Sequence, residues 1–145
     1  MAKPFNFAEY VENNMETWLF GIGSHCSVNH INCSDTELKE RLGKFDDETS
    51  RIITKSSAFI DDDGGDSVYS MILDDILSYE DKIMNWDTHG NKLELYFDFP
   101  LSHNVLGIGY SIYSNTAIRP EKYRIFLSKR GRKHFFIENA FPLIG

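Results

Sequence analysis

Helical and strand patterns occupy separate parts of this 145-residue chain. The long apolar patterns before residue 87 repeat every three or four residues, which is the period of a helix with one buried face. Beyond residue 90 the apolar residues form short runs rich in β-branched and aromatic side chains, as in strands joined by turns. This order favours an α+β fold. We therefore predict N-terminal helices followed by a twisted antiparallel sheet.

Three segments carry helix signals. Residues 7–20 show apolar residues at helical spacing and are followed by glycines. A second helix follows Ser34, because Glu37 three residues later completes a capping box. Residues 66–86 predict one long helix, because their apolar residues step by three or four and would form a buried stripe: Val68, Ile72, Ile76, Tyr79, Ile83 and Trp86.

The predicted strands are short and numerous. One lies near residues 52–60, before an acidic turn, and four follow the turn at residues 89–91: 93–99, 105–113, 123–128 and 134–141. The short turn at Lys129-Arg130-Gly131 predicts a hairpin. Five strand aromatics are assigned to the core rather than to base stacking: Phe97, Phe99, Phe126, Phe135 and Phe136.

Length and charge limit the classes of protein that fit. A chain of this length is expected to form a single domain, residues 1–145, with an N-terminal helix in residues 1–21. The net charge of −7 disfavours a general phosphate-binding surface. The N-terminus has no secretion signal and no run approaches the roughly 20 apolar residues of a membrane helix, so we expect a cytoplasmic protein without a membrane partner.

The stretch HCSVNHINC, residues 25–33, gathers two histidines and two cysteines. Structural zinc sites draw ligand pairs from two separated segments, whereas these four residues crowd one segment with no second cluster downstream. A Cys–His nucleophile is an alternative, but nothing in the sequence marks either cysteine as activated. We therefore predict no metal and no cofactor.

A longer pattern includes this stretch. The spacing of His25, His30, Ser34, Asp35, Leu38, Arg41 and Leu42 is followed by Ser57-Ala58-Phe59, by Trp86 at a helix end, and by Glu138-Asn139-Ala140-Phe141-Pro142. This order resembles the ribonuclease-A-like toxin domain at the C-terminus of bacterial contact-dependent growth inhibition proteins. The resemblance covers residues 22–142. It implies a divergent member of that family with a ribonuclease-A-like fold.

The resemblance also implies a chemistry, namely metal-independent RNA cleavage. Its catalytic residues would be His30, Arg41, Asn139 and His25, with Phe141 contacting the substrate. An imidazole changes charge near neutral pH and suits a general acid or base, and an arginine suits a phosphate. The family has Thr and Tyr where this chain has Asn139 and Phe141. Phenylalanine has no proton to give or take, so a weakened enzyme is one expectation.

Other features complete these predictions. Arg132 and Lys133 belong to the basic run 129–133, the best local place for RNA phosphates, although a solvated hairpin tip is the ordinary fate of such a run. His134 would need a β-bulge to join Asn139 on one strand face. Arg41 could instead form a surface pair with Glu37.

The expected partners are an RNA substrate, either tRNA or RNA in general, and a cognate immunity protein. If the chain is part of a larger toxin, it would be delivered into a neighbouring cell's cytoplasm. The alternative is a catalytically inactive relative that binds protein or RNA as an immunity-type module. Fold alone does not decide between the two.

Overall fold

A computed structural model describes residues 4–21, 30–47, 50–114 and 116–144 of the chain. Helix α1, Phe7–Phe20, begins at Asn6, whose side chain accepts a hydrogen bond from the backbone N–H of Glu9 at 3.0 Å. The residues of its buried face are four apart: Phe7, Val11, Met15 and Leu19. The predicted first helix is therefore confirmed.

The second described helix, α3, spans Asp35–Arg41. The predicted capping box is present: the Ser34 side chain accepts from the backbone N–H of Glu37, and the Glu37 carboxylate accepts from Ser34. Three strands follow, β1 (Phe45–Asp46), β2 (Arg51–Ile52) and β3 (Lys55–Ile60). The buried Leu38 packs α3 onto the β3 side of the molecule.

The predicted long helix is wrong in one respect, because the structure has two helices, α4 (Asp66–Ser78) and α5 (Glu80–His89). The break is at Tyr79, with φ −110° and ψ 21°. There the Tyr79 ring packs edge-on against Phe97 and Phe99, both at 4.7 Å between ring centroids. The predicted apolar stripe survives the break, since Ile76 and Ile83 are both buried.

Four longer strands complete the fold: β4 (Glu94–Pro100), β5 (Leu106–Ser111), β6 (Lys122–Lys129) and β7 (Phe135–Pro142). Three of them form an antiparallel sheet in the order β4–β6–β7. The fourth, β5, pairs antiparallel with β3 in a second sheet. The α+β prediction and the β6–β7 hairpin are confirmed. Pairing of β5 with its neighbours in sequence is not observed, because β5 crosses over to β3.

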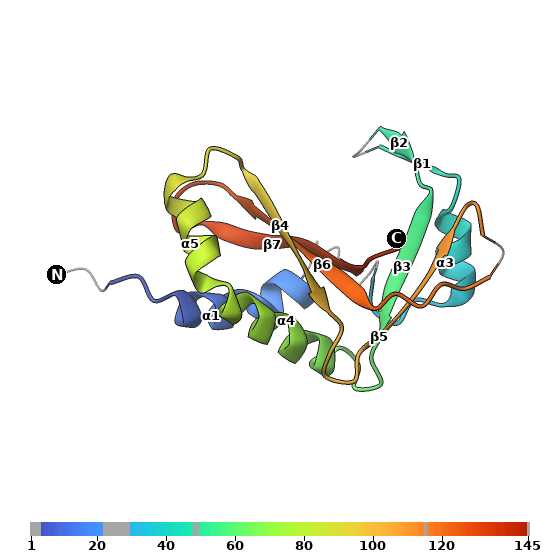
Figure 1. Cartoon of the computed structure of the whole chain (residues 1–145), viewed down its shortest axis with the longest axis horizontal. Helices are drawn as coiled ribbons and strands as arrows, with labels where there is room; N and C mark the ends of the chain where they lie inside the picture. Colours follow the sequence, from blue (N-terminus) through green and yellow to red (C-terminus); the bar gives the residue numbers. More distant parts are fainter. Residues whose placement is uncertain (1–3, 22–29, 48–49, 115, 145) are drawn as a thin grey trace.

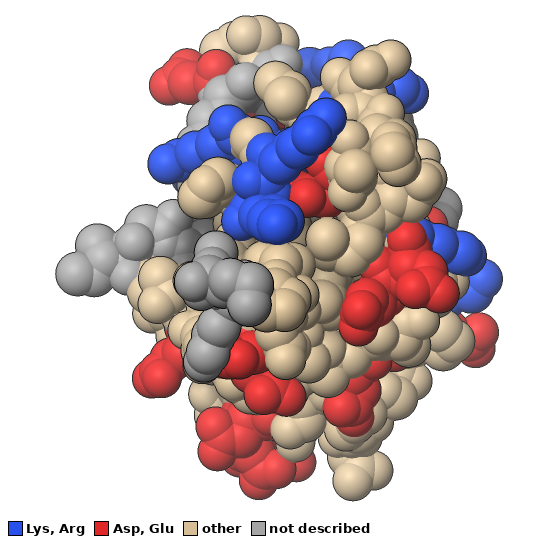
Figure 2. Space-filling view, turned by 90° about the vertical axis from the view of Figure 1, so that its left-hand side faces the viewer, with Lys and Arg blue, Asp and Glu red and all other residues tan. Residues whose placement is uncertain are grey.

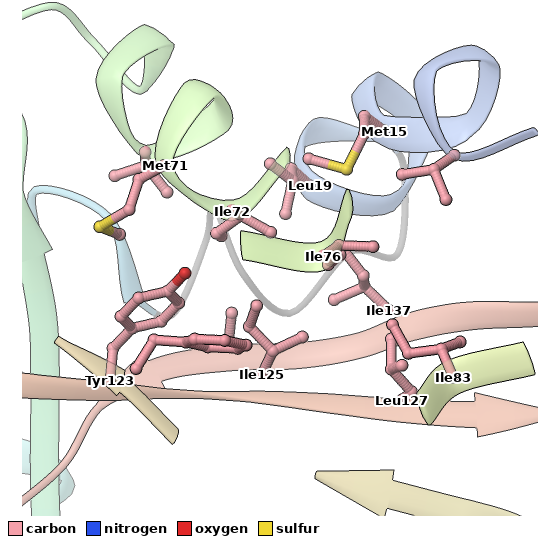
Figure 3. Packing of buried hydrophobic residues seen from close by; sticks show 14 of the residues in the cluster. Met15, Leu19, Met71, Ile72, Ile76, Ile83, Tyr123, Ile125, Leu127 and Ile137 are labelled. Atoms are coloured by element: carbon pink, nitrogen blue, oxygen red, sulfur yellow. The ribbon is translucent and has the colours of Figure 1, made fainter. Parts of the chain in front are cut away.

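The two sheets diverge from a junction between β3 and β7 (Figure 1). Helices α1, α4 and α5 cover one face of β4–β6–β7, and the main core lies between them (Figure 3). A smaller core joins α3 to β3 and β5. Ser57 Oγ donates a 2.8 Å hydrogen bond to the carbonyl oxygen of Pro142 and links the two sheets.

Strand β7 contains a bulge at Glu138. Phe126 on β6 is paired with Asn139. The next residue, Leu127, is paired with Ile137, so Glu138 is an extra residue on β7. The buried positions of the strand change from odd to even numbers there: Phe135, Ile137, Ala140 and Pro142. Asn139 and residue 141 are consequently turned to the outer face, away from the helices.

Among the described residues, no helix is long and apolar enough to cross a membrane.

Candidate functional site

A cleft of about 960 Å³ opens on the outer face of the β4–β6–β7 sheet, where this face meets β3 and the β1–β2 hairpin. Four sequence-predicted site residues line it: His30, Arg41, Asn139 and Phe141. His30 and Arg41 come from one part of the chain, and Asn139 and Phe141 come from another part about a hundred residues later. The fold therefore brings together both halves of the predicted constellation.

Hydrogen bonds to β3 and to Asp61, the residue just after it, hold the segment that carries His30. The backbone N–H of Asn32 donates to the carbonyl oxygen of Phe59 at 2.8 Å. The Asn32 side chain donates to the carbonyl oxygen of Asp61 at 2.8 Å and accepts from its N–H at 2.9 Å. His30 is thereby placed over β3, with its ring centroid 5.6 Å from that of Phe141.

One ring nitrogen of His30 has a fixed role. Nδ1 lies 3.0 Å from the carbonyl oxygen of Ser57. A carbonyl oxygen only accepts hydrogen bonds, so Nδ1 carries the proton in this contact. In the neutral ring Nε2 is then the nitrogen without a proton, which is the arrangement that a general base requires.

Arg41 is the last residue of α3 and is among the residues that line the cleft. Its Nη2 lies 3.5 Å from Cys33 Sγ. Glu37, the acid proposed as its surface partner, is engaged in the capping box with Ser34. Arg41 therefore lines the cleft, while Glu37 caps the start of the same helix.

Asn139 and Phe141 enter the cleft through the bulge. Asn139 Oδ1 accepts from the N–H of Ala140 at 2.9 Å, so its Nδ2 is the group that can donate to a ligand. Phe141 supplies an aromatic face beside His30 and no proton.

The sequence reasoning missed two cations in the cleft, Lys55 and Arg124. Arg124 donates to both carboxylate oxygens of Asp98, at 2.7 and 3.1 Å, and these hydrogen bonds raise the pKa of the guanidinium. Strand alternation on β6 was the available signal, because Arg124 and Phe126 occupy the face opposite the buried Tyr123 and Ile125. Assigning Phe126 to the core was wrong: it is partly exposed and lines the cleft, while Phe136 is also only partly buried.

The cleft also contains carboxylates, from Asp46, Glu94 and Glu138. Glu138 accepts a hydrogen bond from Ser128 Oγ on the neighbouring strand. The site is therefore not uniformly positive. Its cations come from α3, β3 and β6, and its carboxylates come from β1, β4 and β7.

Arg132 and Lys133 do not line this cleft. They lie in the β6–β7 turn, whereas Asn139 and Phe141 lie toward the other end of β7. The turn borders a separate hollow of about 490 Å³ beside the end of α5, and Figure 2 shows Lys and Arg gathered on this end of the molecule. The exposed His134 is also in this turn and outside the cleft.

The turn has structural contacts of its own. The backbone N–H of Lys133 donates to both oxygens of the buried Asp87, at 3.0 and 2.9 Å. Lys129 Nζ donates to the carbonyl oxygens of Trp86 at 2.7 Å and Gly90 at 3.0 Å, at the C-terminal end of α5. These contacts fasten the hairpin to the helix.

His25 lies outside the described residues, as does most of the HCSVNHINC stretch. Within the parts of the chain that the structure describes, no three His, Cys, Asp or Glu side chains are grouped to hold a metal ion.

No protein-family model matches the chain, and no curated protein is significantly similar to it. Among solved structures, a chain of the crystal structure of a CdiA-CT/CdiI complex from Y. kristensenii 33638 is similar, with a TM-score of 0.66 and 18% sequence identity. The similarity covers 84% of this chain and 100% of that chain. At this level of identity the likeness concerns the fold.

Proposed function

We propose that this protein is a metal-independent endoribonuclease of the ribonuclease-A-like toxin type. The observation that carries the proposal is the meeting of His30, Arg41 and Asn139 in one cleft, although they are separated by up to about a hundred residues in sequence. The family resemblance in sequence implies the same residues as the site. The fold likeness to a component of a CdiA-CT/CdiI complex supports a link to toxin and immunity systems of this kind.

The proposed reaction is an internal transesterification of RNA. The 2′-oxygen attacks the adjacent phosphorus, the bond from phosphorus to the 5′-oxygen breaks, and a 2′,3′-cyclic phosphate forms. Nε2 of His30 takes the proton of the 2′-hydroxyl, and Arg41 stabilises the charge that develops on the phosphate oxygens. Asn139 Nδ2 donates to the substrate. The proton for the leaving oxygen is assigned to His25.

A second candidate function is a non-catalytic module that binds RNA or protein. Phe141 favours it, because this residue faces His30 without a hydroxyl group. The carboxylates of Glu94 and Glu138 favour a protein ligand for such a module, since they repel phosphates. Both roles fit a toxin and immunity system.

The deciding experiment is incubation of the purified chain with total RNA in EDTA. We expect cleavage by the wild type and a loss of about 100-fold or more in His30→Ala, because a positioned acid or base contributes about that factor. Arg41→Ala should lose a similar amount. Matched controls are His134→Ala and Arg119→Ala, which alter residues outside the cleft. No cleavage by the wild type, at any protein concentration, would favour the binding module. Cleavage unchanged by His30→Ala would indicate a contaminant or a different site.

An active nuclease requires a neutralising partner in the cell that makes it, and we propose an immunity protein that covers the cleft. The net charge of −7 predicts a partner whose contact face is locally basic.

A further inference from the structure

The outer face of β4–β6–β7 presents two rows of side chains that cross all three strands. Tyr96, Phe126 and Asn139 are paired in register and form one row. Asp98, Arg124 and Phe141 form the next. The Phe126 row begins inside the cleft at Asn139 and extends beyond it to Tyr96, which is 53% exposed.

The two aromatic rings of the first row are nearly parallel. Their planes differ by 18° and their centroids are 6.1 Å apart. Aromatic side chains on a solvent-facing sheet expose apolar surface to water, which is unfavourable unless a ligand covers it. This pair also lies directly beside the amide of Asn139. A flat ligand with an apolar face and polar edges fits both features.

Arg124 holds this surface in place. Its guanidinium carbon lies 4.1 Å from the centroid of the Tyr96 ring, and Asp98 fixes the guanidinium through two hydrogen bonds. The ring, the cation and the carboxylate therefore form one preorganised group. Preorganised aromatic and guanidinium planes are the groups on which proteins stack unpaired bases.

The charges around the cleft separate a base from its phosphate. Asp46 on β1 and Arg124 on β6 also line the cleft. Arg41 and Lys55 come from α3 and β3, whereas Glu94 and Glu138 come from β4 and β7. A phosphate is attracted to the former and repelled by the latter. An uncharged base is not repelled by the carboxylates, and its amino groups can donate to them.

We propose that Tyr96 and Phe126 form a stacking surface for an unpaired nucleobase, so that the protein binds single-stranded RNA with a phosphate toward Arg41 and Lys55. The inference rests on the proposed function for the identity of the ligand as RNA. It adds a substrate class and two binding residues outside the reacting centre. Duplex RNA is excluded because its bases are already stacked and paired.

The test is binding of a fluorescent 2′-O-methyl oligonucleotide, which lacks the attacking hydroxyl and stays intact. We expect Tyr96→Ala and Phe126→Leu each to weaken binding about 5- to 100-fold, the range for loss of one stacked base. Phe126→Leu keeps apolar bulk in the fold, and circular dichroism checks that both variants are folded. The matched control is Tyr113→Ala, which removes an aromatic ring that is 89% exposed and outside the cleft.

Two comparisons separate stacking from phosphate binding. An oligonucleotide with abasic positions should bind the wild type as weakly as the normal one binds the aromatic variants. Arg41→Ala should reduce the salt dependence of binding by about one phosphate contact, while Tyr96→Ala should leave it unchanged. Equal binding of normal, abasic and duplex probes, or no effect of either aromatic variant, would overturn the inference. Base-dependent binding without RNA cleavage would uphold it and reject only the nuclease.

Discussion

Asn32 has a backbone conformation that few residue types tolerate, with φ +53°. Gly and Asn are the residues that adopt the left-handed region most readily, so asparagine suits this backbone position. Its amide also adds the two hydrogen bonds to Asp61 that anchor the His30 segment.

The left-handed conformation of Asn32 predicts an order of stability among variants at position 32. Asn32→Gly and Asn32→Ala both lose the hydrogen bonds to Asp61, but only alanine is strained at a positive φ. We expect Asn32→Ala to be less stable than Asn32→Gly by about 1 kcal/mol in urea unfolding. Equal stability of the two would show that the left-handed conformation is not maintained in solution.

Phe141 is the residue at which activity can be gained. A hydroxyl added to this ring would enter the cleft beside His30, 5.6 Å away between ring centroids, and would supply a proton donor. We expect Phe141→Tyr to raise the rate of RNA cleavage about tenfold or more. Phe136→Tyr is the control, because it adds the same hydroxyl to the same strand outside the cleft. An unchanged rate would locate the weakness of the site elsewhere.

Some site residues follow from the sequence and others do not. His30 and Arg41 were identifiable through the family resemblance, because their spacing from Ser34 and Asp35 matches the family's first motif. Arg124 was not, since its place in the cleft depends on the pairing of β6 with β4 and β7. Arg132 and Lys133 were assigned to the substrate site from their charge alone. Charge does not indicate whether a residue lies at the end of the hairpin that borders the cleft or at the opposite end.

At the scale of elements, local patterns gave the types of element and missed their long-range arrangement. The apolar stripe of residues 66–86 repeats without interruption, so the break at Tyr79 has no signal in the sequence; it lies where this ring meets Phe97 and Phe99. The pairing of β5 with β3 joins strands nearly fifty residues apart. Periodicity describes a strand's faces and not its partner.

Lys129, at the end of β6, fastens the β6–β7 hairpin to α5. Lys129 donates to the last carbonyl groups of α5 and lies over the Trp86 ring at 4.8 Å. Lys129→Met should therefore lower the free energy of unfolding by about 1 kcal/mol or more.

The neighbouring cations give a contrasting prediction. The double variant Arg132→Ala, Lys133→Ala keeps the backbone N–H that binds Asp87, so its stability should change little. Because the turn is outside the cleft, cleavage of a dinucleotide by this variant should match the wild type. A loss of dinucleotide cleavage would return these two residues to the substrate site.

At the scale of the whole molecule, the proposed site is divided between two sheets. His30 lies against the β3–β5 sheet, and Asn139 and Phe141 lie on β7 of the other sheet. Their relative position depends on the junction of β3 with β7, where Ser57 binds Pro142. The carbonyl oxygen of the same Ser57 accepts from His30. One residue of the junction therefore contacts both halves of the site.

Two adjacent serines test the junction. Ser56 and Ser57 are equally buried, at 6% exposed each, but among the described residues Ser56 Oγ has no hydrogen-bond partner. Removing an unpaired buried hydroxyl is neutral or stabilising, whereas removing the Ser57 hydroxyl leaves the Pro142 carbonyl unpaired. We expect Ser57→Ala to lose about 1–2 kcal/mol in urea unfolding and Ser56→Ala to lose none. Ser57→Ala should also slow RNA cleavage under conditions where the variant remains folded, because the two sheets are no longer held together at this hydrogen bond. Equal stability of the two variants would mean that other contacts between the sheets, and not this hydrogen bond, hold the cleft in shape.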